Sequence, residues 1–457
     1  MGRVLIGTFG AAHSTDNPAA LAAFEDAVFA VAAHRPIGNS LQSAIEQDQN
    51  LVSAHALLGF ANVILGRAET ATHARVSLPI VEAALTRCDG GTSSERALVE
   101  ALRHAVDGHL QAAADRLETH LREQPSDFLS LKISQALRFM CGQPAKMLKV
   151  TRGILPSWTS SDRGYGFVLG CHAFGLEECS LLVAAEAVGR DAYRHQPADA
   201  WGLHAVSHVM EMARRTDEGI GWLEASREDW RQCNNFSFHL DWHLALFLLE
   251  QGRIDEVLDV YDRDIRANPT DDFRDMANAT SLLWRLELEG VQVGIRWLEL
   301  AEIAKRRRND VTYVFGTLHY LLALVASRDQ AGAEDLLAAL KQIAADPQHD
   351  QARIAADVGV PLAQIIIEMH QGRASSPDLV EAARKLQTIG GSHAQRDVFL
   401  RTLLMAAANR GDTSAFLRMS RIRQNLRSTD RFIVAVEQRL GSRSGHSDGT
   451  SASRMAS

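Results

Sequence analysis

The sequence is short of the features that mark disulfide-built, membrane-spanning and nucleic-acid-binding proteins. Its five cysteines are odd in number and form no CxxC pair, which argues against a disulfide framework and against a structural zinc knuckle. No apolar run reaches the roughly 20 residues that a membrane-spanning helix needs, and the N-terminal MGRVLIGTFG lacks a signal-peptide cleavage site. The net charge of −8 comes with no basic cluster apart from residues 305–308, so nucleic acid is not an expected partner. We therefore expect a cytoplasmic protein that binds neither membranes nor nucleic acid.

Sustained alternation of apolar and polar residues, the pattern of a β-sheet, is also missing. Apolar residues instead recur at i, i+3, i+4 and i+7 in successive segments, among them residues 51–67, 96–125 and 127–144. Several of the 11 prolines fall in turns between these segments, as in QPSD, QPAD and NPTD. A spacing near 34 residues between successive hairpins is typical of tetratricopeptide-like repeats, whose hairpins bury their apolar faces on one another. The predicted fold is an all-α, tetratricopeptide-like superhelix of stacked antiparallel helical hairpins.

The chain length suits a repeat array better than a single compact core, because 457 residues exceed the size at which one core stops growing. We expect one helical repeat domain over residues 1–440. Residues 441–457, GSRSGHSDGTSASRMAS, are rich in serine and glycine and predict a disordered tail. The composition leaves a homo-oligomer open.

Two pairs of histidines recur at the distance of one repeat. Within each pair, His204 with His208 and His239 with His243, the two residues are four apart, and the second pair follows the first by 35 residues. The first helices of such an array line its concave groove, and neighbouring helices lie about 8–10 Å apart. The spacing of four places each pair on one helix face, and the 35-residue step repeats that face on the next first helix. We predict that the four imidazoles converge on one cavity.

Three further residues belong to the same stripe. Trp201 and Glu211 share the face of the first histidine pair, and Glu177 precedes Glu211 by 34 residues, which is one repeat. Tyr165 in GYGFVLG is also predicted to reach the groove. The glycines of GYGFVLG follow no strand and therefore fit close helix packing better than a phosphate-binding loop.

A second motif, GGSHAQRDVF, ends one helix and begins another, with Ser392 as the expected N-cap. The first turn then carries His393, Gln395, Arg396 and Asp397. Free backbone N–H groups and the helix dipole favour an anion at that place, and an arginine there can bind a carboxylate or phosphate bidentately. We predict that the superhelix curls into a closed ring, which would bring this motif against the histidines.

Five segments of the chain together resemble the tetratricopeptide repeat protein 38 family: RGYGFVLGCHAFGLEE (163–178), AWGLHAVSHVMEM (200–212), FHLDWHLALFLLEQGR (238–253), SLLWRLELEG (281–290) and GGSHAQRDVF (390–399). The resemblance extends over about residues 15–435. It implies an all-α tetratricopeptide-like fold and no particular reaction. Cys171 stands where the family pattern often has methionine, so the resemblance does not support a catalytic cysteine.

Three classes of function remain open. The first is an enzyme acting on a small polar or anionic molecule, with His204, His208, Glu211, His239 and His243 as acid and base groups. The second is a divalent metal ion held by the four histidines, with Glu177 or Glu211 completing the site, since zinc, iron, manganese and nickel accept such ligands. Either site would suit a hydrolase or a lyase. The candidate contacts to the substrate are Tyr165, Glu177, Trp201, His393, Gln395, Arg396 and Asp397.

The third class is a scaffold that binds peptides or proteins without catalysis. Tetratricopeptide grooves of that kind capture peptide carboxylates with lysine, arginine and asparagine. The groove positions of this chain carry histidine, glutamate and aromatic residues instead. The sequence therefore favours a histidine-rich pocket for a small molecule over a scaffold.

Overall fold

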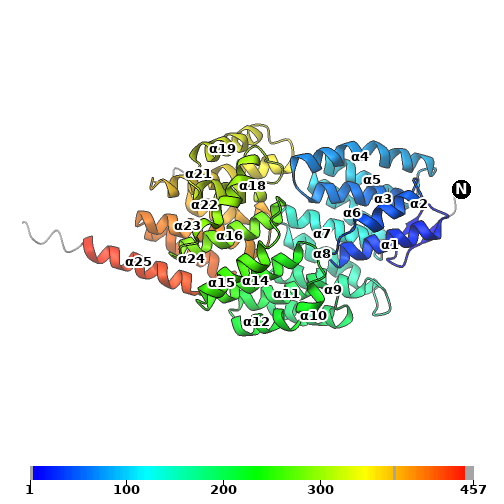
Figure 1. Cartoon of the computed structure of the whole chain (residues 1–457). Coiled ribbons are helices and arrows are strands. Elements are labelled where there is room, and N and C mark those ends of the chain that lie inside the picture. Colours follow the sequence, from blue (N-terminus) through cyan, green and yellow to red (C-terminus); the bar gives the residue numbers. More distant parts are fainter. Residues whose placement is uncertain (1–3, 374–376, 448–457) are drawn as a thin grey trace, which may run out of the picture.

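The structure is a computed structural model that describes residues 4–373 and 377–447, with side chains described as far as Leu440. Across these residues the chain forms twenty-five α-helices and a single β-ribbon, in which β1 (Leu5–Ile6) pairs antiparallel with β2 (Ala12–His13). The helices succeed one another as antiparallel hairpins (Figure 1). The prediction of an all-α fold of stacked helical hairpins is confirmed.

Each hairpin has a first helix and a returning helix. The first helices are α1 (Pro18–Ala32), α3 (Val52–Ile64), α5 (Ser93–Val106), α7 (Phe128–Met140), α9 (Tyr165–Glu177), α11 (Ala200–Met212), α14 (Phe236–Glu250), α16 (Phe273–Leu288), α18 (Val314–Ala326), α21 (Val360–His370) and α23 (His393–Arg410). The returning helices are α2 (Gly38–Gln47), α4 (Ala68–Arg87), α6 (Leu110–Glu123), α8 (Pro144–Ile154), α10 (Leu182–His195), α12 (Thr216–Ala225), α15 (Ile254–Val260), α17 (Trp297–Arg306), α19 (Gln330–Ala344), α22 (Leu379–Lys385) and α24 (Thr413–Gln424).

Shorter elements join or extend these hairpins. They are α13 (Arg227–Trp230), α20 (Asp350–Ile354), the 3₁₀ turns Leu155–Ser157, Gly294–Arg296 and Leu386–Ile389, and the π-helical turns Tyr261–Ile265 and Ala355–Gly359. The last helix, α25, spans Arg431–Ser447. Residues 441–447 are therefore helical, contrary to the prediction of a tail from residue 441, and residues 448–457 lie outside the described residues.

Two glycines let α9 and α11 approach closely. A Cβ atom on Gly202 would lie 3.1 Å from the Cα of Gly170, and a Cβ atom on Gly170 would overlap the Asp199 carboxylate. A side chain at either position would push the helices apart, so the glycine-rich segment GYGFVLG serves helix packing, as the sequence predicts.

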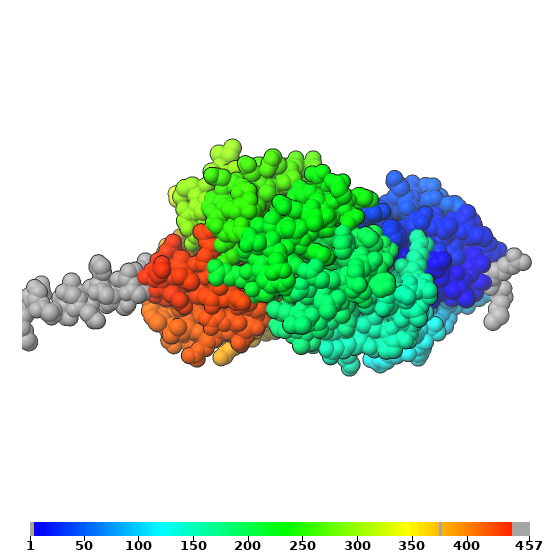
Figure 2. Space-filling model, turned by 90° about the horizontal axis from the view of Figure 1, so that it is seen from below, coloured from blue at the N-terminus to red at the C-terminus, as the bar shows by residue number. Residues whose placement is uncertain are grey.

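The superhelix is closed, because the C-terminal half lies along the N-terminal half. The backbone N–H of Asp350 donates to Gly108 O at 3.1 Å, and that of Ser428 donates to Met212 O at 2.9 Å. Between the same two halves, Arg307 pairs with Glu69 at 2.7 Å. Figure 2 shows the C-terminal helices, in orange and red, against the green middle of the chain. The predicted curl of the superhelix is present.

First helices from both halves consequently face one another across the inside of the molecule. Helix α16 packs on α14, α18 and α23, and α23 also contacts α11. Within the described residues, no helix has the length and apolar character that crossing a membrane requires.

Candidate metal centre

Four consecutive first helices, α9, α11, α14 and α16, carry the groups that build the centre. The middle two are buried on every side: all residues from Gly202 to Met212 and from His239 to Leu249 are buried. Such helices lie inside the array, with neighbours on all faces, so their polar side chains must find partners within the protein. The four histidines are 0–8% exposed.

The Nε2 atoms of the four histidines meet at one point. His204 Nε2 lies 3.0 Å from His239 Nε2 and 3.0 Å from His243 Nε2. His243 Nε2 in turn lies 3.1 Å from His208 Nε2 and 3.3 Å from His239 Nε2. The convergence that the 35-residue spacing predicts is present, since the ligand atoms of all four residues lie within 4.8 Å of one another.

The Nδ1 atoms of three histidines point away from this meeting point to oxygen acceptors. His208 Nδ1 donates to Glu177 Oε2 at 3.1 Å, and His243 Nδ1 donates to Glu211 Oε2 at 3.1 Å. His239 Nδ1 donates to Asn278 Oδ1 at 2.9 Å. His204 differs, because its buried Nδ1 has no hydrogen-bond partner among the described residues.

These outer hydrogen bonds determine what the Nε2 atoms can do. A neutral imidazole that donates through Nδ1 carries a lone pair on Nε2. The Nε2 atoms of His208, His239 and His243 therefore direct lone pairs into the same small volume. His204 can donate one proton from its Nε2, and a protonated His208 could donate another. The 3.3 Å contact between His239 and His243 still brings two lone pairs together.

A cation at the meeting point removes this conflict. For metal–nitrogen distances of about 2.0–2.1 Å, two nitrogens on one ion are about 2.9 Å apart at a right angle and about 3.4 Å apart at a tetrahedral angle. Four of the six separations between the Nε2 atoms, at 3.0–3.3 Å, lie within that range, and all the ligand atoms lie within 4.8 Å of one another. The geometry thus fits one transition-metal ion bound by imidazole nitrogens.

The electrostatic environment keeps most of these imidazoles neutral. Burial, together with the neighbouring histidines, holds the pKa of His204 and of His239 well below the usual value. Burial lowers the pKa of His243 to about 4, although Glu211 opposes the shift. His208 differs, because Glu177 raises its pKa against the effect of burial. Neutral imidazole is the form that binds metal.

The two outer glutamates titrate differently. Burial raises the pKa of Glu177 more than His208 lowers it. Burial also opposes ionisation of Glu211, but the hydrogen bond from His243 and the charges of His243 and Arg427 lower its pKa to about 2. At least one carboxylate therefore stands behind the histidines in the charged form, ready to balance the charge of a bound cation.

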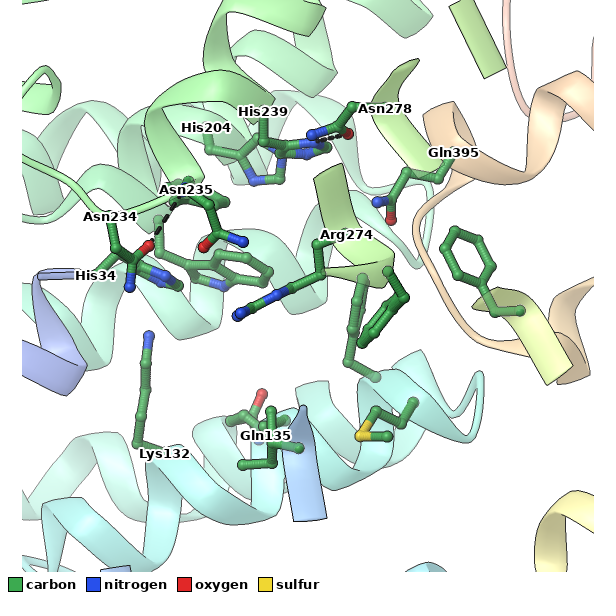
Figure 3. Close-up of a pocket in the computed structure, with 18 of the residues that line it drawn as sticks. His34, Lys132, Gln135, His204, Asn234, Asn235, His239, Arg274, Asn278 and Gln395 are labelled. Atoms are coloured by element: carbon green, nitrogen blue, oxygen red, sulfur yellow. Dashed lines mark hydrogen bonds between the residues drawn. The ribbon is translucent and has the colours of Figure 1, made fainter. Parts of the chain in front are cut away.

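A cavity of about 180 Å³ adjoins the centre, and His204 and His239 form part of its wall (Figure 3). Its other walls come from both halves of the closed superhelix. They include Lys132 and Phe139 of α7, Arg274 and Asn278 of α16, Phe315 of α18, Gln395 of α23, Trp201 and Phe236, and His34 from the turn after α1. A small molecule in this cavity would lie beside the histidine cluster.

The structure brings part of the predicted site together. Trp201 and Gln395 line the cavity, while Glu177 and Glu211 hold the Nδ1 atoms of His208 and His243. Ser392 caps α23 as predicted, accepting a hydrogen bond from the backbone N–H of Gln395.

The guanidinium of Arg396 is bound by protein groups, and its role in binding an anionic ligand stays a prediction. Its guanidinium donates to Glu178 Oε2 at 2.9 Å, to His393 Nδ1 at 2.9 Å and to the carbonyl oxygens of Gly390 and Gly391. His393 Nε2 donates to the backbone oxygen of Glu178 at 3.0 Å. Both Nη atoms of Arg396 are bound by protein acceptors, so Arg396 and His393 hold α23 against the end of α9.

Asp397 and Tyr165 also lie away from the cavity. Asp397 accepts hydrogen bonds from Arg401 at 2.8 Å and Arg423 at 2.7 Å within a buried ionic network. Tyr165 packs edge-on against His195, with ring centroids 5.1 Å apart. Neither residue lines the cavity, so the cavity does not support their predicted contacts with substrate.

Two residues at the site were not predicted, although the 35-residue spacing leads to both of them. One more step of 35 residues leads from His239 to Arg274 and from His243 to Asn278. Asn278 orients His239, and Arg274 reaches the cavity. By contrast, no spacing in the sequence indicates Lys132 or His34. These two residues reach the cavity from other hairpins, through the packing of the whole chain.

Comparisons with known proteins add little to these observations. No protein-family model matches the chain. Among solved structures, one described as "Structure of Naa15/Naa10 bound to HypK-THB" matches 94% of this chain and 67% of that chain, with 13% sequence identity and a TM-score of 0.24. The class of the protein, an all-α array of helical hairpins with a buried histidine cluster, therefore rests on its own structure. Membership of the tetratricopeptide repeat protein 38 family stays a prediction.

Proposed function

We propose that this protein is a metal-dependent enzyme. In this proposal the Nε2 atoms of His204, His208, His239 and His243 bind one divalent transition-metal ion, and the adjoining cavity binds a small molecule on which the ion acts. The observation that carries the proposal is the convergence of four Nε2 atoms while three of the Nδ1 atoms are held by oxygen acceptors. Metal-binding histidines in proteins have this arrangement, with the outer nitrogen donating to a carboxylate or amide oxygen.

The ligand set indicates the class of metal. Imidazole nitrogen suits zinc, copper, iron and nickel, whereas magnesium and calcium prefer oxygen ligands. The carboxylates of Glu177 and Glu211 are engaged by Nδ1 atoms rather than directed at the meeting point of the Nε2 atoms. We therefore expect zinc or a neighbouring first-row metal.

The difference between His204 and the other three histidines supports catalysis. Structural metal sites are closed, whereas catalytic sites keep a position open for water or substrate. His204 lines the cavity and lacks a partner for Nδ1, so no second hydrogen bond holds its ring in one orientation. His204 is the ligand that can yield its place on the ion to a molecule in the cavity. A metal ion so exposed would polarise a carbonyl group or activate a water molecule, which suits a hydrolase or a lyase.

The closed superhelix weakens the alternative of a peptide-binding scaffold. The inner faces of α7 and α11 meet α16 and α23 across a cavity of about 180 Å³, and the walls come from both halves of the chain. An extended peptide needs an open groove, whereas a small molecule suits an enclosed space.

Element analysis of the purified protein by plasma mass spectrometry tests the proposal. We expect about one transition-metal ion per chain, and expect His208→Ala and His243→Ala to remove it. His204→Ala should retain metal with lower affinity, because three oriented ligands remain. His73→Ala changes an exposed histidine on α4 and serves as the control. A folded protein that contains no such metal, and gains none on titration with zinc, cobalt, nickel or iron(II), would overturn the proposal.

A further inference from the structure

We infer that the cavity beside the histidine cluster binds a small organic carboxylate with an apolar body, whose carboxylate group lies between Lys132 and Arg274. The inference rests on the proposed function for the role of this molecule as substrate. The anion site itself depends on residues that are not metal ligands, and it can be tested without metal.

The charges of the cavity wall favour an anion. Lys132 and Arg274 contribute the two permanent cations of the wall, and none of the residues that line the cavity is an aspartate or a glutamate. Figure 3 shows the two cationic side chains directed toward the same space, Lys132 from α7 and Arg274 from α16. An anion in this space would interact favourably with both side chains.

Lys132 lacks a protein partner for its charge. Its ammonium group makes no hydrogen bond or ion pair with the described residues, and its nearest recorded interaction is with the ring of Trp201, at 5.4 Å from the centroid. Asp199 interacts with it electrostatically, but burial raises the pKa of this carboxyl to about 7, so its negative charge is incomplete at neutral pH. Removing part of an ammonium group from water costs free energy, which an anion beside Lys132 would offset.

Arg274 retains a free N–H donor, and its side chain is directed toward the same space as Lys132. Its Nε and one Nη donate to the two oxygens of Asp272 at 2.9 and 2.6 Å. The other nitrogen, Nη1, makes no hydrogen bond with the described residues and is available to a ligand. Because Asp272 offsets the charge of Arg274, the net charge of Lys132, Arg274 and Asp272 together is close to that of Lys132 alone. This balance suits a monoanion such as a carboxylate better than a phosphate dianion.

Apolar side chains complete the cavity. Trp201, Phe139 and Phe236 form one wall, and His34 stacks on Phe236 with ring centroids 4.3 Å apart. Burial holds the pKa of His34 well below its usual value, so this ring adds an uncharged surface. Apolar walls with a few polar groups at fixed places are typical of a pocket for a small organic molecule.

Unsatisfied polar atoms mark where such a molecule would bind. Gln135 lines the cavity and is 4% exposed, yet its Oε1 has no hydrogen-bond partner among the described residues. The Nε2 atom of His34, in the same cavity, also lacks one. Buried polar atoms without partners are rare in proteins, and in a cavity they indicate a missing ligand or water.

The repeat explains why the anion site and the metal site are neighbours. His204, His239 and Arg274 follow one another at 35-residue steps on α11, α14 and α16. Equivalent positions on three adjacent first helices thus present two metal ligands and then an anion-binding group. A carboxylate bound by Arg274 and Lys132 would place the rest of the molecule along the wall formed by His204 and His239.

Calorimetric titration with matched probes tests the inference. We would titrate 3-phenylpropionate, 4-methylpentanoate, 3-phenylpropionamide and inorganic phosphate into protein with metal and into protein treated with a chelator. We expect a carboxylate to bind both forms and the neutral amide to bind at least about tenfold more weakly, because the amide loses the charge-assisted bonds. Lys132→Met keeps the apolar stem and should weaken carboxylate binding by a similar factor. Lys149→Met, an exposed lysine on α8, should not.

Each possible result of these titrations either supports the inference or contradicts it. Equal affinity for the amide and the carboxylate, unchanged carboxylate binding in Lys132→Met, or tighter binding of phosphate would overturn it. Failure of both carboxylates to bind at millimolar concentration would also overturn it. Carboxylate binding to a protein that contains no transition metal as purified and gains none on titration would support the anion site while contradicting the proposed metal function, so the two failures are distinguishable.

Discussion

His208 and Glu177 form a hydrogen bond of 3.1 Å between two side chains that are both fully buried. The residues come from adjacent first helices, α11 and α9, and the bond holds the imidazole with its Nε2 toward the other three histidines. A carboxylate behind a histidine raises the basicity of the metal-binding nitrogen and keeps the ring in place.

Replacing this carboxylate should weaken metal binding without unfolding the protein. We expect Glu177→Gln to lower metal affinity by about 10–100-fold, because the amide oxygen can accept the Nδ1 proton but lacks the charge. Competition with a chelator of known affinity measures the change. Glu218→Gln, an exposed position on α12, is the control. Equal affinities of Glu177→Gln and the parent protein would contradict the assigned role.

Asp199 should make the stability of the protein depend on pH. Its side chain is fully buried at the start of α11 and accepts a hydrogen bond from the backbone N–H of Gly202 at 3.1 Å. Burial raises the pKa of this carboxyl to about 7, whereas an unfolded aspartate has a pKa of about 3.9. The folded state therefore binds more protons between about pH 4 and pH 7, and the contribution of Asp199 to stability is lost as pH rises through this window.

Asp199→Asn should remove this part of the pH dependence, since asparagine also caps a helix and carries no charge. We expect the variant to be more stable than the parent at pH 8, with the advantage disappearing toward pH 4. Urea unfolding at a series of pH values measures this difference in stability between the variant and the parent protein. An unchanged pH profile would show that Asp199 is already ionised in the folded protein without cost.

Breaking the buried ionic network around Asp397 should strongly destabilise the protein. Asp397 and Asp430 pair with Arg401 and Arg423, and these four side chains are 0–5% exposed. We expect Asp397→Asn to lower the free energy of unfolding by about 3–5 kcal/mol, because it leaves two buried guanidinium groups short of a counter-charge.

A surface ion pair provides the comparison for this effect. Glu302→Gln breaks the exposed pair with Lys305 and should cost less than about 1 kcal/mol. Denaturant midpoints measure both variants. Similar losses in the two would contradict the importance of the buried network.

Two glycine substitutions should have opposite effects. Gly170→Ala would force a Cβ atom into the Asp199 carboxylate and separate α9 from α11, so we expect a loss of about 1–3 kcal/mol from overpacking. Gly221 lies within α12 with open space around it, and Gly221→Ala should stabilise the protein by about 0.5–1 kcal/mol. Thermal unfolding of both variants checks the pair, and a neutral Gly170→Ala would contradict the close approach of the two helices.

Much of the candidate centre is visible in the sequence because it depends on two local periodicities. Helical spacing places His204 and His208 on one face, and the repeat length carries that face to His239 and His243. Stacked hairpins then bring the two faces together, since equivalent positions on adjacent first helices are neighbours in space. The same reasoning places Glu177 on the stripe of Glu211, one repeat earlier, although its bond to His208 appears only in the structure. The helix start at Ser392 follows from local capping rules.

Only the tertiary structure decided which charges meet across the closed superhelix. Arg396 pairs with Glu178, which lies 218 residues earlier in the chain, a partner that no local pattern in the sequence indicates. Lys132 and His34 enter the cavity from α7 and from the turn after α1, far in sequence from the histidines. Repeat periodicity describes contacts between neighbouring hairpins, but the closing of one half on the other depends on the summed twist and packing of all the hairpins, which no local pattern contains.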